Sequence, residues 1–227
     1  MLVPGMLCDD DLWTGVRDGL GARTVTAAIT APTITAMAAQ VLGTTAGPFA
    51  LIGLSLGAIV GFEVMRLAPE RVTAFCAIST NAAAPTPAQL SGWRATAERV
   101  ERGEFDDVVK DDILPTMFSP RAADALAARF TGMAARIGPD GLRAQLAAQA
   151  TRTDAFPVLA QATCPILVVC GDADALCPVD FHQRIAATAP GGRLHVVPGA
   201  GHLLPMERSR ESSELLRAWL PDTAPAA

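Results

Sequence analysis

The 227-residue chain has no tyrosine, a single lysine (Lys110) and no run of about 18 apolar residues. The missing run argues against a membrane-spanning helix, and a short apolar start without basic residues argues against a secretory signal. Lys and Arg number 18 against 23 Asp and Glu, and they form no basic cluster. Because contacts to phosphate backbones need clustered positive charge, we expect no nucleic-acid partner and no membrane partner.

Cysteine pairs with disulfide or metal-site spacing are also missing. The five cysteines are an odd number without a C-x-x-C pair, which is typical of small buried side chains in a reducing cytoplasm. The three histidines share no metal-ligand spacing, and no phosphate-binding loop is visible. We therefore expect a cytoplasmic protein without metal or cofactor. The oligomeric state is not predicted. The cysteines are Cys8, Cys76, Cys164, Cys170 and Cys177.

Half of the residues are hydrophobic, and they form short apolar runs that alternate with helical patterns. Near-continuous apolar strands are typical of a parallel sheet buried on both faces. The alternation predicts an α/β fold with a mainly parallel sheet of about six strands flanked by helices. The expected strands are 2–4, 24–29, 49–52, 72–79, 165–170 and 193–197. The expected helices are 10–20, 33–43, 56–68, 180–189 and 207–219.

One connection is too long for a loop. About 85 residues between Ser79 and Pro165 contain helical stretches near 88–102, 104–114, 120–137 and 139–151 but no strand. We interpret residues 82–160 as a helical cap and residues 1–81 and 161–227 as the α/β core. The Pro- and Ala-rich tail, 221–227, is expected to fray.

The strongest functional signal is the sequence Gly-Leu-Ser-Leu-Gly at residues 53–57. It follows an expected strand and opens an expected helix, which is the context that a G-x-S-x-G nucleophile requires. The serine must project from a sharp, strained turn, and glycines on both sides remove side chains that would collide there. Ser55 is therefore the candidate nucleophile, with the helix N-terminus behind it favouring a developing anion.

A serine hydroxyl needs a base, and the base needs an orienting carboxylate. His202 follows the last expected strand in the sequence Gly-Ala-Gly-His, at the sheet edge where Ser55 also lies, and is the candidate base. His182, on a helix, and His195, in a strand, are expected to be structural. Asp172 and Asp174 both follow the fifth strand. We favour Asp174 as the acid because it lies further into the loop, whereas Asp172 is placed to bond the turn's backbone.

Acyl transfer also needs hydrogen-bond donors for the developing oxyanion. The backbone N–H of Leu56, directly after the candidate nucleophile, is one. The loop at residues 4–7 after the first strand supplies the other, since Gly5 lets the backbone turn so that the Met6 N–H faces Ser55.

Together these residues resemble the α/β-hydrolase superfamily. The resemblance rests on Pro-Gly-Met at 4–6, the G-x-S-x-G at 53–57, Ala-Pro-Glu-Arg-Val at 68–72, Gly-Asp-Ala-Asp at 171–174 with Pro178, and Gly-Ala-Gly-His at 199–202. It covers nearly the whole chain outside the cap and is closest to small helix-capped enzymes such as esterases, enol-lactonases and C–C bond hydrolases. It implies Ser55 as nucleophile, Asp174 as acid, His202 as base, and Met6 and Leu56 as oxyanion donors.

The combined interpretation is a serine hydrolase that cleaves a carboxylic ester or related acyl substrate through an acyl-enzyme. The same residues could also carry out C–C bond hydrolysis, enol-lactone opening or acyl transfer. The alternative that is not an enzyme is a catalytically inactive protein that binds a small ligand. In the cap, Trp93 and Phe130 are the candidates for contacting a small-molecule acyl substrate.

Overall fold

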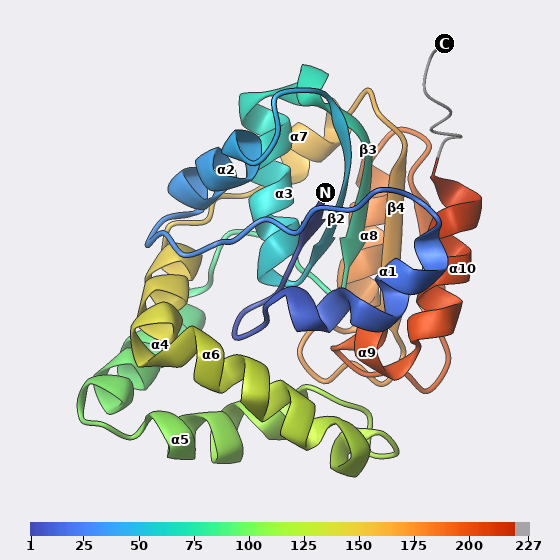
Figure 1. The fold of residues 1–227 in the computed structure, drawn as a ribbon. Coiled ribbons are helices and arrows are strands. Elements are labelled where there is room, and N and C mark those ends of the chain that lie inside the picture. Colours follow the sequence, from blue (N-terminus) through green and yellow to red (C-terminus); the bar gives the residue numbers. More distant parts are fainter. Residues whose placement is uncertain (221–227) are drawn as a thin grey trace.

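The computed structural model describes residues 1–220 and contains one parallel sheet (Figure 1). The expected tail, 221–227, lies outside the described residues. The sheet has five strands in the order β1-β2-β3-β4-β5, with every neighbouring pair parallel. The strands are β1 (Leu2–Val3), β2 (Phe49–Leu54), β3 (Val72–Ile78), β4 (Ile166–Gly171) and β5 (Arg193–Val197).

The strand expected at 24–29 is wrong, and the sheet has five strands rather than six. This segment runs beside β1 and forms only an isolated parallel bridge between Leu2 and Thr26. Its partner strand has just two residues, because Pro4 follows and lacks the N–H that a longer ladder would need.

Helices cover both faces of the sheet (Figure 1). The β3 strand shows the division: Cys76 and Ile78 pack into one hydrophobic cluster, and Phe75 and Ala77 into another. This alternation follows the two-residue period of a strand. The first cluster contains the 3₁₀ turn η1 (Asp10–Trp13), α1 (Thr14–Leu20), α9 (Leu204–Glu207) and α10 (Ser209–Trp219). The second contains α2 (Ile34–Gly43), α3 (Leu56–Leu67), α7 (Phe156–Ala160) and α8 (Val179–Thr188).

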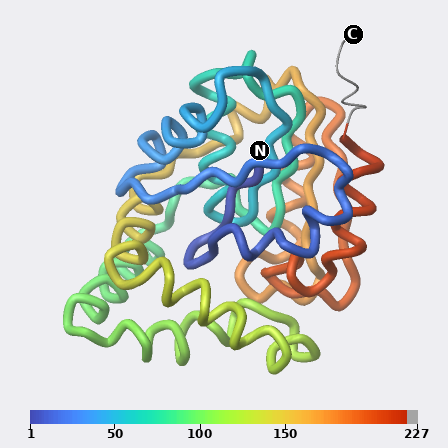
Figure 2. Tube along the Cα trace, viewed as in Figure 1, coloured from blue at the N-terminus to red at the C-terminus, as the bar shows by residue number. Residues whose placement is uncertain are grey.

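The segment between β3 and β4 is helical and lies beyond the carboxyl ends of the strands (Figures 1 and 2). The two helices expected at 120–137 and 139–151 form one element, α6, which is broken at Gly138, where φ is 71°. Phe130 and Met133 of α6 belong to the same cluster as α1 and α10, so this segment shares its core with the sheet. Its elements are α4 (Pro87–Glu101), α5 (Phe105–Asp107), the π-helix η3 (Val108–Ile113), the 3₁₀ turn η4 (Leu114–Thr116) and α6 (Ala123–Ala150).

The last helix before β4, α7, packs against α3 and α8. Leu159 of α7 belongs to the same hydrophobic cluster as residues of α3 and α8. Among the described residues, no helix combines the length and the apolar character needed to cross a bilayer.

The contact between α3 and β1 leaves no space for a side chain at Gly57, and this makes a stability prediction. A Cβ at Gly57 would lie 2.2 Å from the Val3 carbonyl oxygen, whereas a Cβ at Gly43 meets nothing within 4 Å. We expect Gly57→Ala to lower the free energy of unfolding by about 1–3 kcal/mol or more, because backbone must shift. The matched Gly43→Ala, at the end of α2, should be neutral or stabilising by up to about 1 kcal/mol. Urea unfolding of both variants tests this; equal stabilities would contradict it.

Candidate active site

Ser55 lies in the turn between β2 and α3 with a backbone conformation rare for a non-glycine residue. Its φ is 53° and its ψ is −114°, a strain of about 1–3 kcal/mol that surrounding contacts must hold. The Ser55 N–H donates to the Ile78 carbonyl at 2.8 Å, and the Thr80 hydroxyl donates to the Ser55 carbonyl at 3.0 Å. Ile78 ends β3 and Thr80 follows it by two residues, so the end of the neighbouring strand and the residues after it hold the turn.

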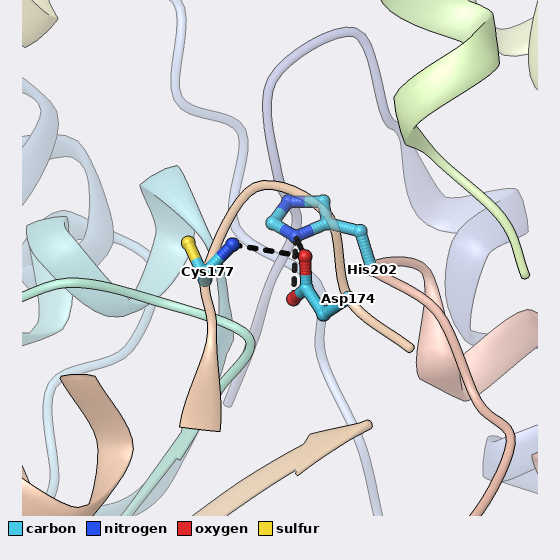
Figure 3. A group of neighbouring side chains, drawn as sticks. All are labelled: Asp174, Cys177 and His202. Carbon is cyan, nitrogen blue, oxygen red and sulfur yellow. Dashed lines mark hydrogen bonds and ion pairs between the residues drawn. The ribbon is translucent and has the colours of Figure 1, made fainter. Parts of the chain in front are cut away.

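Asp174 and His202 form a buried pair at the ends of β4 and β5 (Figure 3). The His202 Nδ1 lies 3.1 Å and 2.9 Å from the two Asp174 carboxylate oxygens. The same carboxylate accepts the backbone N–H groups of Leu176 at 2.9 Å and Cys177 at 3.0 Å. Asp172 instead accepts the N–H of Gly199 at 2.6 Å. The structure therefore brings Asp174, not Asp172, to the imidazole.

Asp174 and His202 each change the pKa of the other. Burial lowers the pKa of His202, but contact with Asp174 and the Cys177 thiol raises it by more, so the net pKa lies above its ordinary value. Burial raises the pKa of Asp174, but the bond to His202 and the backbone N–H groups outweigh burial and lower it. Asp174 is therefore an anion near neutral pH. Its bond to Nδ1 leaves Nε2 as the free nitrogen of His202 for proton exchange.

Ser55 and His202 line one cavity of about 180 Å³, which the inserted helices cover. Trp93 from α4 lines this cavity, as sequence analysis expected, and so does Met117, which it did not assign. Phe130 does not: it is fully buried and packs edge-to-face against Phe118, which corrects its assignment to the pocket. A larger hollow of about 780 Å³ lies around Met1, Phe49 and Arg217 and contains none of the candidate site residues.

The two expected oxyanion donors lie beside Ser55. Leu56 is the first residue of α3, so its N–H has no partner within the helix. A Cβ at Gly5 would be 3.5 Å from the Ser55 Cβ, which places the loop carrying Met6 against the turn. The backbone N–H of Leu7, the residue after Met6, donates to the buried Gln145 side chain of α6 at 2.9 Å. Leu7 has a φ of 58°, so α6 helps to hold a strained loop.

The inserted segment also holds the loop that carries His202. The Leu203 N–H donates to the Met117 carbonyl at 2.9 Å. One Glu207 carboxylate oxygen accepts the N–H groups of Ser119 and Gly201, each at 3.0 Å. Sequence reasoning missed the contacts of Gln145 and Glu207 with the loops that carry Met6 and His202, because nothing in their local pattern indicates which loop they contact.

Asp174, Cys177 and His202 also offer atoms that all lie within 4.8 Å of one another, close enough for a metal ion (Figure 3). Within the described range this is the one such group. Each Asp174 oxygen already accepts a hydrogen bond from within the protein. Cys177 lines the cavity and is a second nucleophilic side chain beside Ser55.

His182 is buried and supports the Ser55 turn indirectly. Its Nε2 accepts the backbone N–H of Thr80 at 2.8 Å, and its Nδ1 lies 3.1 Å from the Pro178 carbonyl. These two bonds require the neutral ring with the proton on Nδ1. The structural role expected for His182 is thus specific: it connects the end of β3 to the loop after β4.

The neutral form of His182 makes stability depend on pH. Burial lowers its pKa below the ordinary 6.5, so its stabilising effect is complete above about pH 6.5 and is lost as pH falls below it. At pH 7.5, His182→Leu should lower the free energy of unfolding by about 1–3 kcal/mol, because the Thr80 N–H loses its acceptor. The gap between wild type and variant should narrow toward pH 5 in urea unfolding. A stability difference between wild type and His182→Leu that stays constant with pH would contradict this. The control is His195→Gln, which should not show the same narrowing of the stability difference toward pH 5.

Residues 7–215 match the sequence model described as the alpha/beta hydrolase family. The curated "Putative non-heme bromoperoxidase BpoC" of Mycobacterium tuberculosis is 28% identical over 207 residues, 84% of this chain and 75% of that protein. A thermophilic esterase from Thermogutta terrifontis has 27% identity and a TM-score of 0.84, with 96% of this chain and 87% of that chain covered.

An enol-lactonase from Burkholderia xenovorans LB400 has a TM-score of 0.82 over 95% of this chain and 88% of that one, and at 18% identity it supports the fold alone. The family match spans most of the sequence and agrees with the parallel sheet, the turn at Ser55 and the pair at the ends of β4 and β5. The chain belongs to the alpha/beta hydrolase family.

Proposed function

We propose that this protein is a serine hydrolase that cleaves a carboxylic ester through an acyl-enzyme. The observation that carries the proposal is the strained Ser55, which lines the same cavity as His202, whose ring is held by a buried carboxylate. A strained serine that shares a cavity with such a pair is the arrangement that activates a hydroxyl for acyl transfer.

In the first step, the Ser55 Oγ attacks the ester carbonyl carbon while the His202 Nε2 accepts the hydroxyl proton. Negative charge develops on the carbonyl oxygen, and the N–H groups of Met6 and Leu56 are the donors that stabilise it. The N-terminus of the 12-residue α3 adds a favourable field at the same place. Collapse breaks the ester C–O bond, and the protonated His202 gives its proton to the leaving alcohol.

In the second step, water enters the cavity and His202 removes its proton as the oxygen attacks the acyl carbon. The Ser55 Oγ leaves and regains a proton from His202, which releases the acid. Asp174 acts through His202: it fixes the proton on Nδ1 and stabilises the imidazolium that forms in both steps. Its backbone donors at Leu176 and Cys177 hold the carboxylate in place.

Covalent labelling tests the nucleophile. A fluorophosphonate probe should modify Ser55, and Ser55→Ala should abolish both labelling and hydrolysis of a short p-nitrophenyl ester. Cys177→Ala is the matched control, because Cys177 lines the same cavity; it should keep the label. Mass spectrometry of the labelled peptide identifies the residue that carries the adduct. A folded wild type that neither reacts with the probe nor cleaves esters would favour a silent ligand-binding protein.

Two aspartates after the same strand provide a comparison for the orienting role. Asp174→Asn should lower kcat by up to about 10⁴-fold, because the amide favours the wrong tautomer of His202. Asp172→Asn removes a bond to Gly199 and should act mainly on stability. Because Asp174 raises the pKa of His202, wild-type kcat/KM should rise with pH to a midpoint above 6.5, as the base loses its proton.

The same pH–rate profile of Asp174→Asn should have its midpoint at lower pH than wild type, since the anion that favours imidazolium is gone. A larger kcat loss in a folded Asp172→Asn would reverse the two assignments.

A further inference from the structure

Arg152 is a buried arginine in the cavity that Ser55 and His202 line. It follows the end of α6, is 7% exposed, and lines the cavity. Sequence analysis did not single it out, because nothing in its neighbourhood distinguishes it from the arginines on solvated helix faces.

The guanidinium of Arg152 is held in place without a counter-ion. Nη1 donates to the Gln149 Oε1 at 3.3 Å, Nη2 donates to the Gln89 Oε1 at 3.2 Å, and the group lies 5.2 Å from the centre of the Trp93 ring. Its buried Nε has no hydrogen-bond partner. In the described part of the chain no carboxylate forms an ion pair with it, whereas the more exposed Arg143 pairs with both Glu101 and Asp140.

A buried positive charge without an anion is unfavourable, and burial lowers the pKa of Arg152. Arginine nevertheless stays protonated in proteins, so it cannot relieve this by losing its proton. The protein holds the guanidinium rigidly between two amides and an indole ring instead. Such a prepared, uncompensated donor is suited to an anion that arrives with a ligand.

The surrounding wall supplies further donors and no competing anion. The amide oxygens of Gln89 and Gln149 face Arg152, and that of Asn81 accepts the Ala83 N–H. All three residues line the cavity, and within residues 1–220 their NH₂ groups donate no hydrogen bond to the protein. No Asp or Glu is among the described residues lining it. The wall is rich in donors and lacks negative charge.

We propose that the cavity takes an ester that also carries a carboxylate: a short monoester of a dicarboxylic acid, with its carboxylate on Arg152 and its ester carbonyl at Ser55. The planar carboxylate matches the two-pronged guanidinium, and a cavity of about 180 Å³ accepts a chain of a few carbons, as a cavity of about 150 Å³ accepts benzene. This assignment rests on the proposed hydrolysis at Ser55. Water adds across the ester bond, and alcohol and dicarboxylate leave.

The test compares monomethyl glutarate, an anion at pH 7.5, with the uncharged dimethyl glutarate. Wild type should have a kcat/KM about ten- to a hundredfold higher for the monoester. Arg152→Gln should lose that preference, because the kcat/KM for the monoester falls toward that for the diester. Arg94→Gln, an exposed arginine next to Trp93 on α4, is the matched control and should retain the preference.

Binding separates this inference from the hydrolase proposal. In calorimetry at constant ionic strength, Ser55→Ala should bind glutarate and not the uncharged glutaramide, and adding Arg152→Gln should abolish the binding. If wild type leaves both esters intact and Ser55 is never labelled, hydrolysis is wrong while calorimetry still decides the ligand of Arg152. If Arg152→Gln does not fold, the difference between glutarate and glutaramide binding to Ser55→Ala decides whether the cavity takes a carboxylate.

Equal binding of glutarate and glutaramide would overturn the assignment. So would an equal loss of kcat/KM for both esters in a folded Arg152→Gln.

Discussion

The positive φ of Ser55 is the constraint on which the rest of the site depends. A serine in this conformation is strained unless its neighbours hold it, and the structure uses β3 to do so through the Ile78 carbonyl and the Thr80 hydroxyl. Thr80 is in turn held by the neutral ring of His182. The turn also requires α3 to approach β1 so closely that Gly57 has no space for a Cβ. The position of Ser55 is therefore a property of the sheet's interior packing.

The inserted helices have two relations to this site. Trp93 and Arg152 line the cavity and are in a position to choose a ligand. Gln145 instead contacts the loop that carries Met6. Ser119 is linked through Glu207 to the loop that carries His202. A cap that only set substrate choice would lack such bonds. Substitutions in the inserted helices should therefore fall into two groups. Those that face the cavity should change which substrate is preferred, and those bonded to the loops should change the rate with every substrate.

The electrostatics of the cavity differ from those of the pair beneath it. Asp174 and His202 compensate each other's charge inside the protein, so the pair is complete without a ligand. Arg152 is held by neutral groups alone, so its charge is left for whatever enters. The charges of the Asp174–His202 pair are thus separate from the charge of Arg152. A ligand with a carboxylate at one end and an ester at the other would satisfy both.

Local pattern in the sequence determined the parallel α/β fold and the elements that carry Ser55, Asp174 and His202, because strand periodicity and the glycines at 53 and 57 depend on near neighbours. It overestimated the sheet, since whether residues 24–29 pair depends on the two-residue length of β1. The loop position had already favoured Asp174, and the structure brings that carboxylate, not Asp172, to His202. Only the tertiary structure decided that Phe130 is core and that Arg152 is buried, within residues 1–220, without a counter-ion. Each of these depends on contacts between residues far apart in the chain, and the spacing of residues along the sequence carries no record of which distant side chains meet.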